Sequence, residues 1–226
     1  NSLFVNLFMS NTVTVRVGGK EMVLRQQTLY PWEGDIHITI DKATGKNVTL
    51  KIRIPGWVEN RPVPGDLYAY HDSKTPSYSI LVNGKDVVFT LCNGYYCIER
   101  KWKKGDRVDV NFLMDARTVA ANEKVSADRG RVAVERGPLV YCAEWPDNDF
   151  ELRQVIMNPA PEFKTVSVPG KLYGIVQLET RARLQSCQEE GHPVPKEVTL
   201  TLIPYYAWAH RGAGSMLVWL PQAYKN

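Results

Sequence analysis

The 226-residue sequence has no apolar run that approaches the ~20 residues of a membrane-spanning helix, and it shows no signal-peptide pattern. It also has no large excess of charge, since 28 Lys and Arg residues against 24 Asp and Glu leave a net charge of +4. We therefore expect neither a membrane nor a nucleic acid as a partner. The chain opens at Asn1 without an initiator Met, so we expect a segment of a longer polypeptide. The sequence does not indicate the cellular compartment of that polypeptide.

Cysteine is scarce. Four cysteines are too few for a disulfide scaffold in a chain of this length, no Cys-x-x-Cys spacing occurs, and none of the four His residues clusters with a Cys. A structural zinc site needs such ligands at short, regular spacing. We therefore expect no metal or other cofactor in this chain, and reduced structural thiols at Cys92, Cys97, Cys142 and Cys187.

Helical patterns are also missing, because no stretch of about ten residues has apolar positions at i, i+3, i+4 and i+7. Instead, 16 Gly and 14 Pro residues interrupt the chain at short intervals. Between them, apolar and polar residues alternate with the period of two of a half-buried strand. This alternation covers residues 35–40, 47–54, 107–112 and 197–202. Gly18-Gly19, between two apolar segments, predicts a hairpin turn.

Short strands separated by turns predict an all-β protein of the β-sandwich class. One sandwich takes about 100 residues, so we expect two tandem, jelly-roll-like sandwiches. The first covers residues 1–118 and the second 119–226, with a linker near 117–122. The last strand, 216–220, is expected to return to the first sandwich. Residues 158–170 and 185–196 are expected to form long loops, the second of which carries Cys187 and His192.

No catalytic constellation stands out. Gly-x-Ser-x-Gly is absent, and no Gly-rich loop precedes a helix. General acid/base hydrolysis of glycosides typically uses two carboxyl groups, but Glu33 with Asp35, and Glu189 with Glu190, are interpreted as solvated turn residues. We therefore assign no catalytic and no cofactor-binding residue.

Aromatic residues at strand ends are the remaining candidates. Pro or Gly next to Tyr30, Trp32 and Trp57 turns the chain out of the strand, and the segment that holds Trp208 and Arg211 likewise leaves a strand for a turn. Trp and Arg concentrate at interface cores, so these five residues are candidates for docking a domain that this chain lacks. They could equally form a platform that stacks on sugar rings, or simply fill the sandwich cores.

Nine short strings occur in an order that resembles the C-terminal half of glycoside hydrolase family 127, the β-L-arabinofuranosidase-type enzymes. They cover nearly the whole chain: LFVNLF at 3–8, TLYPWEG at 28–34, LKIRIPGW at 50–57, VNG at 82–84, GY at 94–95, RKWKKGD at 100–106, RGPLVY at 136–141, IPYYAWAHRG at 203–212 and MLVW at 216–219. One departure is His210, where the family pattern has Asn before Arg-Gly.

The resemblance implies that the chemistry lies outside this chain. Enzymes of the family carry an N-terminal (α/α)₆ barrel with a zinc ion, a cysteine nucleophile and a Glu acid/base, and none of these positions maps onto a residue here. We therefore expect a non-catalytic β-sandwich region that braces or caps the absent barrel of a retaining glycosidase acting on L-arabinofuranoside-like plant glycans. The partner of such a region would be the barrel. The alternative is an independent carbohydrate-binding module, whose partner would be carbohydrate. Cleavage of glycosides by this chain itself is the third hypothesis.

Overall fold

The computed structural model describes residues 1–72, 74, 78–185 and 196–223. Cys187, Glu189, Glu190 and His192, and with them most of the loop expected at 185–196, lie outside these residues. The described chain is all-β, as expected, and its helical segments are five 3₁₀ turns: η1 (Gly56–Glu59), η2 (Ser126–Asp128), η3 (Trp145–Asp147), η4 (Leu152–Gln154) and η5 (Tyr205–Ala207). No helix within these ranges is long and apolar enough to cross a membrane.

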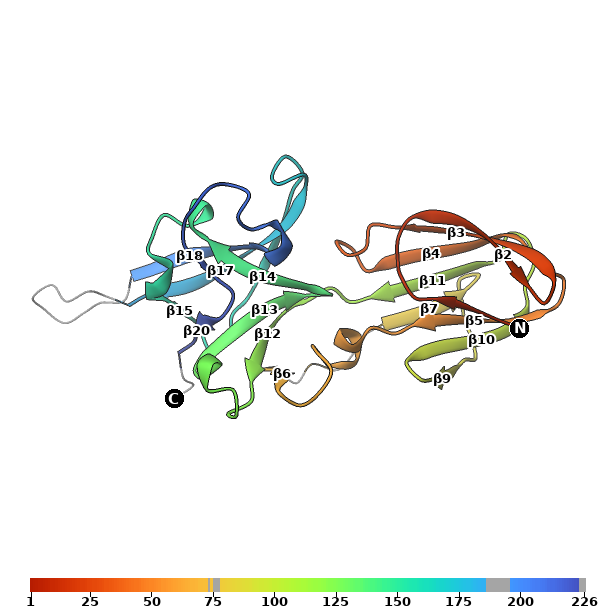
Figure 1. Cartoon of the computed structure of the whole chain (residues 1–226), viewed down its shortest axis with the longest axis horizontal. Helices are drawn as coiled ribbons and strands as arrows, with labels where there is room; N and C mark the ends of the chain where they lie inside the picture. The colour runs from red at the N-terminus through yellow and green to blue at the C-terminus, as the bar shows by residue number, and fades with distance from the viewer. Residues whose placement is uncertain (73, 75–77, 186–195, 224–226) are drawn as a thin grey trace, which may run out of the picture. The chain divides into compact units, whose positions relative to one another are not determined.

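The chain forms two compact units (Figure 1). The first consists of Asn1–Arg61 and Lys74–Met114, and the second of Pro62–Ser73 and Asp115–Asn226.

The first unit contains two sheets. The smaller sheet has the order β1 (Ser2–Val5), β5 (Asn47–Arg53), β10 (Tyr95–Lys101), β9 (Thr90–Cys92). The larger sheet has the order β2 (Asn11–Val17), β3 (Lys20–Thr28), β4 (Asp35–Lys42), β11 (Arg107–Phe112), β7 (Tyr78–Val82), β8 (Lys85–Asp86). All strand pairs are antiparallel except β1 with β5.

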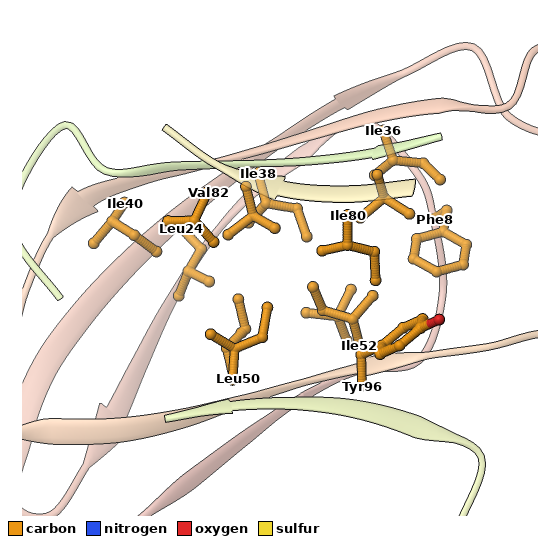
Figure 2. Close-up of a cluster of buried hydrophobic side chains, with 14 of the residues drawn as sticks. Phe8, Leu24, Ile36, Ile38, Ile40, Leu50, Ile52, Ile80, Val82 and Tyr96 are labelled. Carbon is orange, nitrogen blue, oxygen red and sulfur yellow. The ribbon is translucent and has the colours of Figure 1, made fainter. Parts of the chain in front are cut away.

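The two sheets enclose one hydrophobic core, which makes this unit a β-sandwich. Along β4 the burial alternates, and Ile36, Ile38 and Ile40 are fully buried. In Figure 2 these side chains lie opposite Leu50, Ile52 and Tyr96 of the smaller sheet. The period of two in the sequence therefore gives each strand one core face and one polar face. Gly18 and Gly19 both have positive φ, as the predicted hairpin turn requires.

The second unit is built on one hydrogen-bonded sheet. The order of its main strands is β15 (Val155–Met157), β17 (Ile175–Leu184), β18 (Lys196–Pro204), β14 (Leu139–Glu144), β13 (Arg131–Arg136), β12 (Ala116–Ala121), β6 (Tyr68–Tyr70). Three more strands pair with members of this sheet. They are β16 (Lys164–Val168), which pairs with β17, β19 (Met216–Leu217), which pairs with β14, and β20 (Leu220–Pro221), which pairs with β13. Both β13 and β14 pair with three strands each, so the sheet branches, and its buried residues form a second core.

Three expectations about the domain division are corrected. The boundary expected at 118 and the linker expected at 117–122 fall on strand β12, which pairs with both β13 and β6, and the break lies between Met114 and Asp115. The last strand does not return to the first sandwich, because Met216 and Leu220 pair with β14 and β13. The units are also not strictly tandem, since the segment Pro62–Ser73 belongs to the second one.

Candidate functional site

A cluster of buried charges lies at one end of β14. Arg211 donates from Nη1 and Nη2 to the two carboxylate oxygens of Asp147, at 2.8 and 2.7 Å. It also donates from Nε to Glu144 Oε2, at 3.1 Å, and a second bond joins Nη2 to the same oxygen. Lys171 Nζ donates to Asp147 Oδ1 at 2.5 Å. Two carboxylates are thus neutralised by two cations, in a cluster where the side chain of Glu144 is 2% exposed.

The charges in this cluster stabilise one another. Hydrogen bonds that Arg211 donates to Asp147 and Glu144 raise its pKa above the ordinary value, although burial opposes them. Burial raises the pKa of Asp147, but the hydrogen bonds from Arg211 and Lys171 outweigh this and hold it below its usual range. Asp147 and Arg211 therefore carry their charges at neutral pH.

The cluster anchors a loop of aromatic residues, 205–211, which we call the aromatic loop. Glu144 Oε1 accepts a hydrogen bond from the backbone N–H of Ala209, at 2.9 Å. Tyr205 and Trp208 stack with ring centroids 6.2 Å apart and planes 20° apart, and they are 43% and 37% exposed. Tyr206 between them is 55% exposed. The loop thus presents large rings to solvent from a rigid, charged base.

The three other candidates, Tyr30, Trp32 and Trp57, belong to the first unit. Tyr30 and Trp57 are partly buried and pack against its core, where their rings make edge contacts with Phe8 and Phe112 at 5.4 and 5.8 Å. Burial raises the pKa of Tyr30, and the neighbouring Trp57 and Arg53 oppose that shift. Trp32 is half-buried.

The five candidates are therefore divided between the two units, with Trp208 and Arg211 in the second. Arg211 acts as the anchor of the aromatic loop, and Trp208 is one of its three exposed rings. Core packing accounts in part for Tyr30 and Trp57. Docking to another domain and stacking on sugars both stay predictions for the exposed rings.

Sequence reasoning missed a second charged cluster in the second unit. The Arg117 guanidinium pairs with the carboxylate of Asp72 and lies 3.6 Å over the ring of Tyr70. Tyr70 donates its hydroxyl to Glu135 Oε2 at 2.9 Å. Burial raises the pKa of Glu135, against the opposing effects of Tyr70 and Arg117. A carboxyl group with a raised pKa is typical of functional sites and also of buried structural networks.

The partners of Arg211 were missed too. Glu144 ends the apolar run Leu139–Glu144, and a carboxylate at a buried strand position signals that a cation lies nearby. That signal does not identify the cation, because 67 residues separate Glu144 from Arg211.

The thiols differ in their surroundings. Cys142 is fully buried, and burial raises its pKa to about 12. Burial also raises the pKa of Cys97, whereas hydrogen bonds from Thr90 and Cys97 lower the pKa of the exposed Cys92. Among the described residues, no three His, Cys, Asp or Glu side chains are grouped so as to hold a metal ion.

Comparison with known proteins covers nearly the whole chain. The family model "Beta-L-arabinofuranosidase, GH127 middle domain" matches residues 2–114, and "Glycoside hydrolase family 127 C-terminal domain" matches residues 116–221. A curated relative, the non-reducing end β-L-arabinofuranosidase of Bifidobacterium longum subsp. longum, is 30% identical over 229 residues, which cover 93% of this chain and 32% of the relative.

Solved structures agree with these matches. A GH127 β-arabinofuranosidase is 52% identical with a TM-score of 0.94, over 98% of this chain and 35% of that one. A GH127 β-L-arabinofuranosidase from Geobacillus stearothermophilus T6 is 29% identical with a TM-score of 0.84, over 98% and 34%. A further glycoside hydrolase is 33% identical with a TM-score of 0.81, over 98% and 36%.

The fold and these matches define the β-rich part of a glycoside hydrolase. The chain belongs to glycoside hydrolase family 127 and consists of its middle and C-terminal domains, which confirms the resemblance seen in the sequence. It spans about a third of the length of the relatives that it matches. The domain models also divide the chain where the structure does, next to Asp115.

Proposed function

We propose that this chain is the non-catalytic accessory region of a β-L-arabinofuranosidase, and that it braces a catalytic barrel contributed by another part of the polypeptide. One observation carries the proposal: the chain matches only the middle and C-terminal domains, and the family enzymes are about three times as long. The family's zinc ion and cysteine nucleophile then belong to the barrel. The substrate class follows the names of the relatives, which are β-L-arabinofuranosidases.

The chemistry of the thiols supports this assignment. A cysteine nucleophile must be available as a thiolate, so its pKa must lie near or below the working pH. The pKa of Cys142 is raised to about 12, and the pKa of Cys97 is raised by burial, so neither thiol suits that role. Cys92 is exposed on an edge strand, next to Thr90 and Lys51 and without a neighbouring carboxyl acid/base among its interacting groups.

The aromatic loop supports a docking role. Exposed clusters of large rings in soluble proteins commonly mark contact surfaces. Tyr205, Tyr206 and Trp208 form such a cluster, and Arg211 fixes its base through Glu144 and Asp147. A preorganised surface of this kind loses little conformational entropy when a partner covers it. The partner that the proposal requires is the barrel.

The experiment is an assay of the purified chain with an aryl β-L-arabinofuranoside, together with metal analysis. A full-length relative assayed in parallel is the positive control. The proposal predicts no turnover above buffer and no stoichiometric zinc in the chain. Turnover by the chain that disappears on chelation would overturn the proposal and favour the hypothesis that the chain is itself an enzyme.

A further inference from the structure

The edge of β17 carries a gap between two neighbouring strands. β15 pairs with its C-terminal half, ending at Met157 opposite Ala182, and β16 pairs with its N-terminal half, beginning at Lys164 opposite Glu179. On β17, only two residues separate the two pairings. The connection from β15 to β16 that runs beside them has six residues, 158–163. These six residues are therefore displaced from the sheet as a loop.

The displaced loop forms one wall of a cavity of about 490 Å³, which β17 and β18 complete. This volume lies in the range of about 300–1,000 Å³ that is typical of small-molecule sites. The loop is held in place, because Asn158 Nδ2 donates to the carbonyl of Arg181 at 3.2 Å. Gln222 Nε2 donates to the carbonyl of Asn158 at 3.1 Å and contacts that of Pro159 at 3.4 Å. The cavity is thus preformed.

The lining combines charge balance with hydrogen-bonding capacity. Glu162 and Glu179 supply two carboxylates, and Lys164 and Arg181 supply two cations, so an ion of either sign gains no net attraction. Phe163 adds an aromatic face that packs against the core on one side. A neutral ligand rich in hydroxyl groups matches this combination of donors, acceptors and one ring.

Glu179 is a positioned acceptor. Lys164 Nζ donates to Glu179 Oε2 at 3.2 Å, and Gln177 Nε2 donates to Glu179 Oε1 at 3.1 Å. Gln177 in turn accepts from Lys171 Nζ at 3.2 Å, which is the lysine that also binds Asp147. Each carboxylate oxygen of Glu179 accepts one of these bonds and keeps a lone pair for a ligand. The chain of hydrogen bonds links the cavity to the Arg211 cluster.

Thr180 closes the cavity on its inner side. It is 4% exposed, and the alternating burial along β17 places its side chain on the core face, opposite to Glu179 and Arg181. Its Oγ1 is buried and has no hydrogen-bond partner within the described part of the chain. The polar groups that a ligand can reach are therefore those of Glu179 and its neighbours on the other face.

We propose that this cavity binds a neutral sugar unit, with Glu179 accepting from sugar hydroxyls and Phe163 packing on the ring. The proposal is independent of the bracing role, because it concerns a different surface from the aromatic loop. It also differs from a sugar platform on Tyr205 and Trp208, which would leave the cavity empty.

The test is NMR titration of the isotope-labelled chain with the neutral saccharides L-arabinose, xylobiose and cellobiose, and with the charged D-galacturonic acid and D-glucosamine. The proposal predicts that a neutral saccharide shifts the signals of residues 158–164 and 177–181, with a Kd on the order of 1 mM. Glu179→Gln is expected to weaken this binding by roughly tenfold, as at a binding hot spot. Phe163→Leu, which keeps the apolar packing but loses the flat ring, is expected to weaken it as well.

Glu21→Gln is the matched control, since Glu21 forms a similar exposed cross-strand ion pair with Lys42, at 2.6 Å, in the first unit. It should leave binding unchanged, and thermal melts should show that all variants are folded. Three results would overturn the proposal: no shift in the cavity up to about 10 mM of every neutral saccharide, binding of the charged sugars alone, or shifts confined to the aromatic loop. None of them depends on whether the chain braces a barrel, which is tested by turnover.

Discussion

Arg211 is the residue on which the aromatic loop depends most. It neutralises Glu144, whose side chain is 2% exposed, and Asp147, whose side chain is 7% exposed. A buried carboxylate that loses its cation is strongly destabilising, whereas an intact buried pair contributes little net stability. The main effect of Arg211 is therefore to hold Glu144 in position, so that Glu144 can accept the hydrogen bond from the Ala209 N–H.

Replacing Arg211 by Met should lower the free energy of unfolding by about 3–5 kcal/mol, because Glu144 is left buried and uncompensated. Urea denaturation measures the loss. The double variant Arg211→Met with Glu144→Gln is the control, since Gln keeps the acceptor for the Ala209 N–H without the charge. It should be less destabilised than Arg211→Met alone. Equal losses in the two variants would show that the ion pair does not hold the loop.

Glu135 is expected to contribute less stability as the pH rises, which is opposite to the pH dependence of a carboxylate in an ordinary ion pair. Its pKa is raised by burial in the folded state, so the folded protein binds this proton more tightly than the unfolded chain does. The resulting stability is fully present below the ordinary value of about 4.3, and it is lost as the pH rises through the raised pKa.

Glu135→Gln should therefore become stabilising relative to the natural protein as the pH is raised from about 4 to 7. The side-chain oxygen of Gln can still accept the hydrogen bond from Tyr70. Urea denaturation at both pH values gives the difference, and Glu123→Gln, at an exposed turn position, should not change with pH in this way. A Glu135→Gln variant that loses stability at neutral pH would contradict the account.

At the scale of elements, the alternating pattern predicted the strands well where each strand has one core face. β4, β5, β11 and β18 coincide closely with the expected segments because burial there follows the period of two. The linker prediction was wrong at β12, because its sequence, ARTVAA, is polar and rich in small residues and carries no alternating pattern. Its strand character comes from pairing with β13 and β6, which is tertiary information.

The candidate site was predictable only in part for the same reason. Trp208 lies in a segment that leaves a strand for a turn, and the residue is 37% exposed, while its docking role stays a prediction. The partners of Arg211 lie 64 and 67 residues away, and no local pattern encodes such distances. The two-residue strands β19 and β20 are likewise too short to carry a periodic signal.

Gly34 shows how closely two elements approach in the first unit. It lies next to β4, and a Cβ at this position would come within 1.8 Å of the carbonyl oxygen of Phe112. Phe112 also donates its N–H to the Gly34 carbonyl at 3.0 Å. Only a residue without a side chain permits this pairing of backbones.

Gly34→Ala should therefore destabilise the first unit by about 1–3 kcal/mol or more, the cost of overpacking a close contact. Amide exchange in β4 and β11 measures the effect in that unit. Gly170→Ala is the control, because a Cβ there meets nothing within 4 Å, and it should be nearly neutral. Unchanged protection in β4 and β11 of the Gly34 variant would show that the close approach is not required.

At the scale of the whole molecule, two all-β units of family 127 form a chain about a third as long as the family's enzymes. We propose two tasks for them, on separate surfaces. The proposed task of the aromatic loop is to dock the catalytic barrel, and that of the cavity beside β17 is to bind a neutral sugar. Docking of the barrel would give these all-β units a role in a glycoside hydrolase without a share in the chemistry.

The measurement that tests this claim most directly is the activity and thermal stability of a chimera. In the solved GH127 β-arabinofuranosidase, which is 52% identical, this chain replaces the matching 35% of the enzyme, and a second version lacks that region altogether. The account predicts that the chimera turns over an aryl β-L-arabinofuranoside within about tenfold of the parent, a difference of about 1.4 kcal/mol in the barrier. It predicts that the deleted version loses both its activity and its thermal stability. A deleted enzyme as active and as stable as the parent would contradict the bracing role.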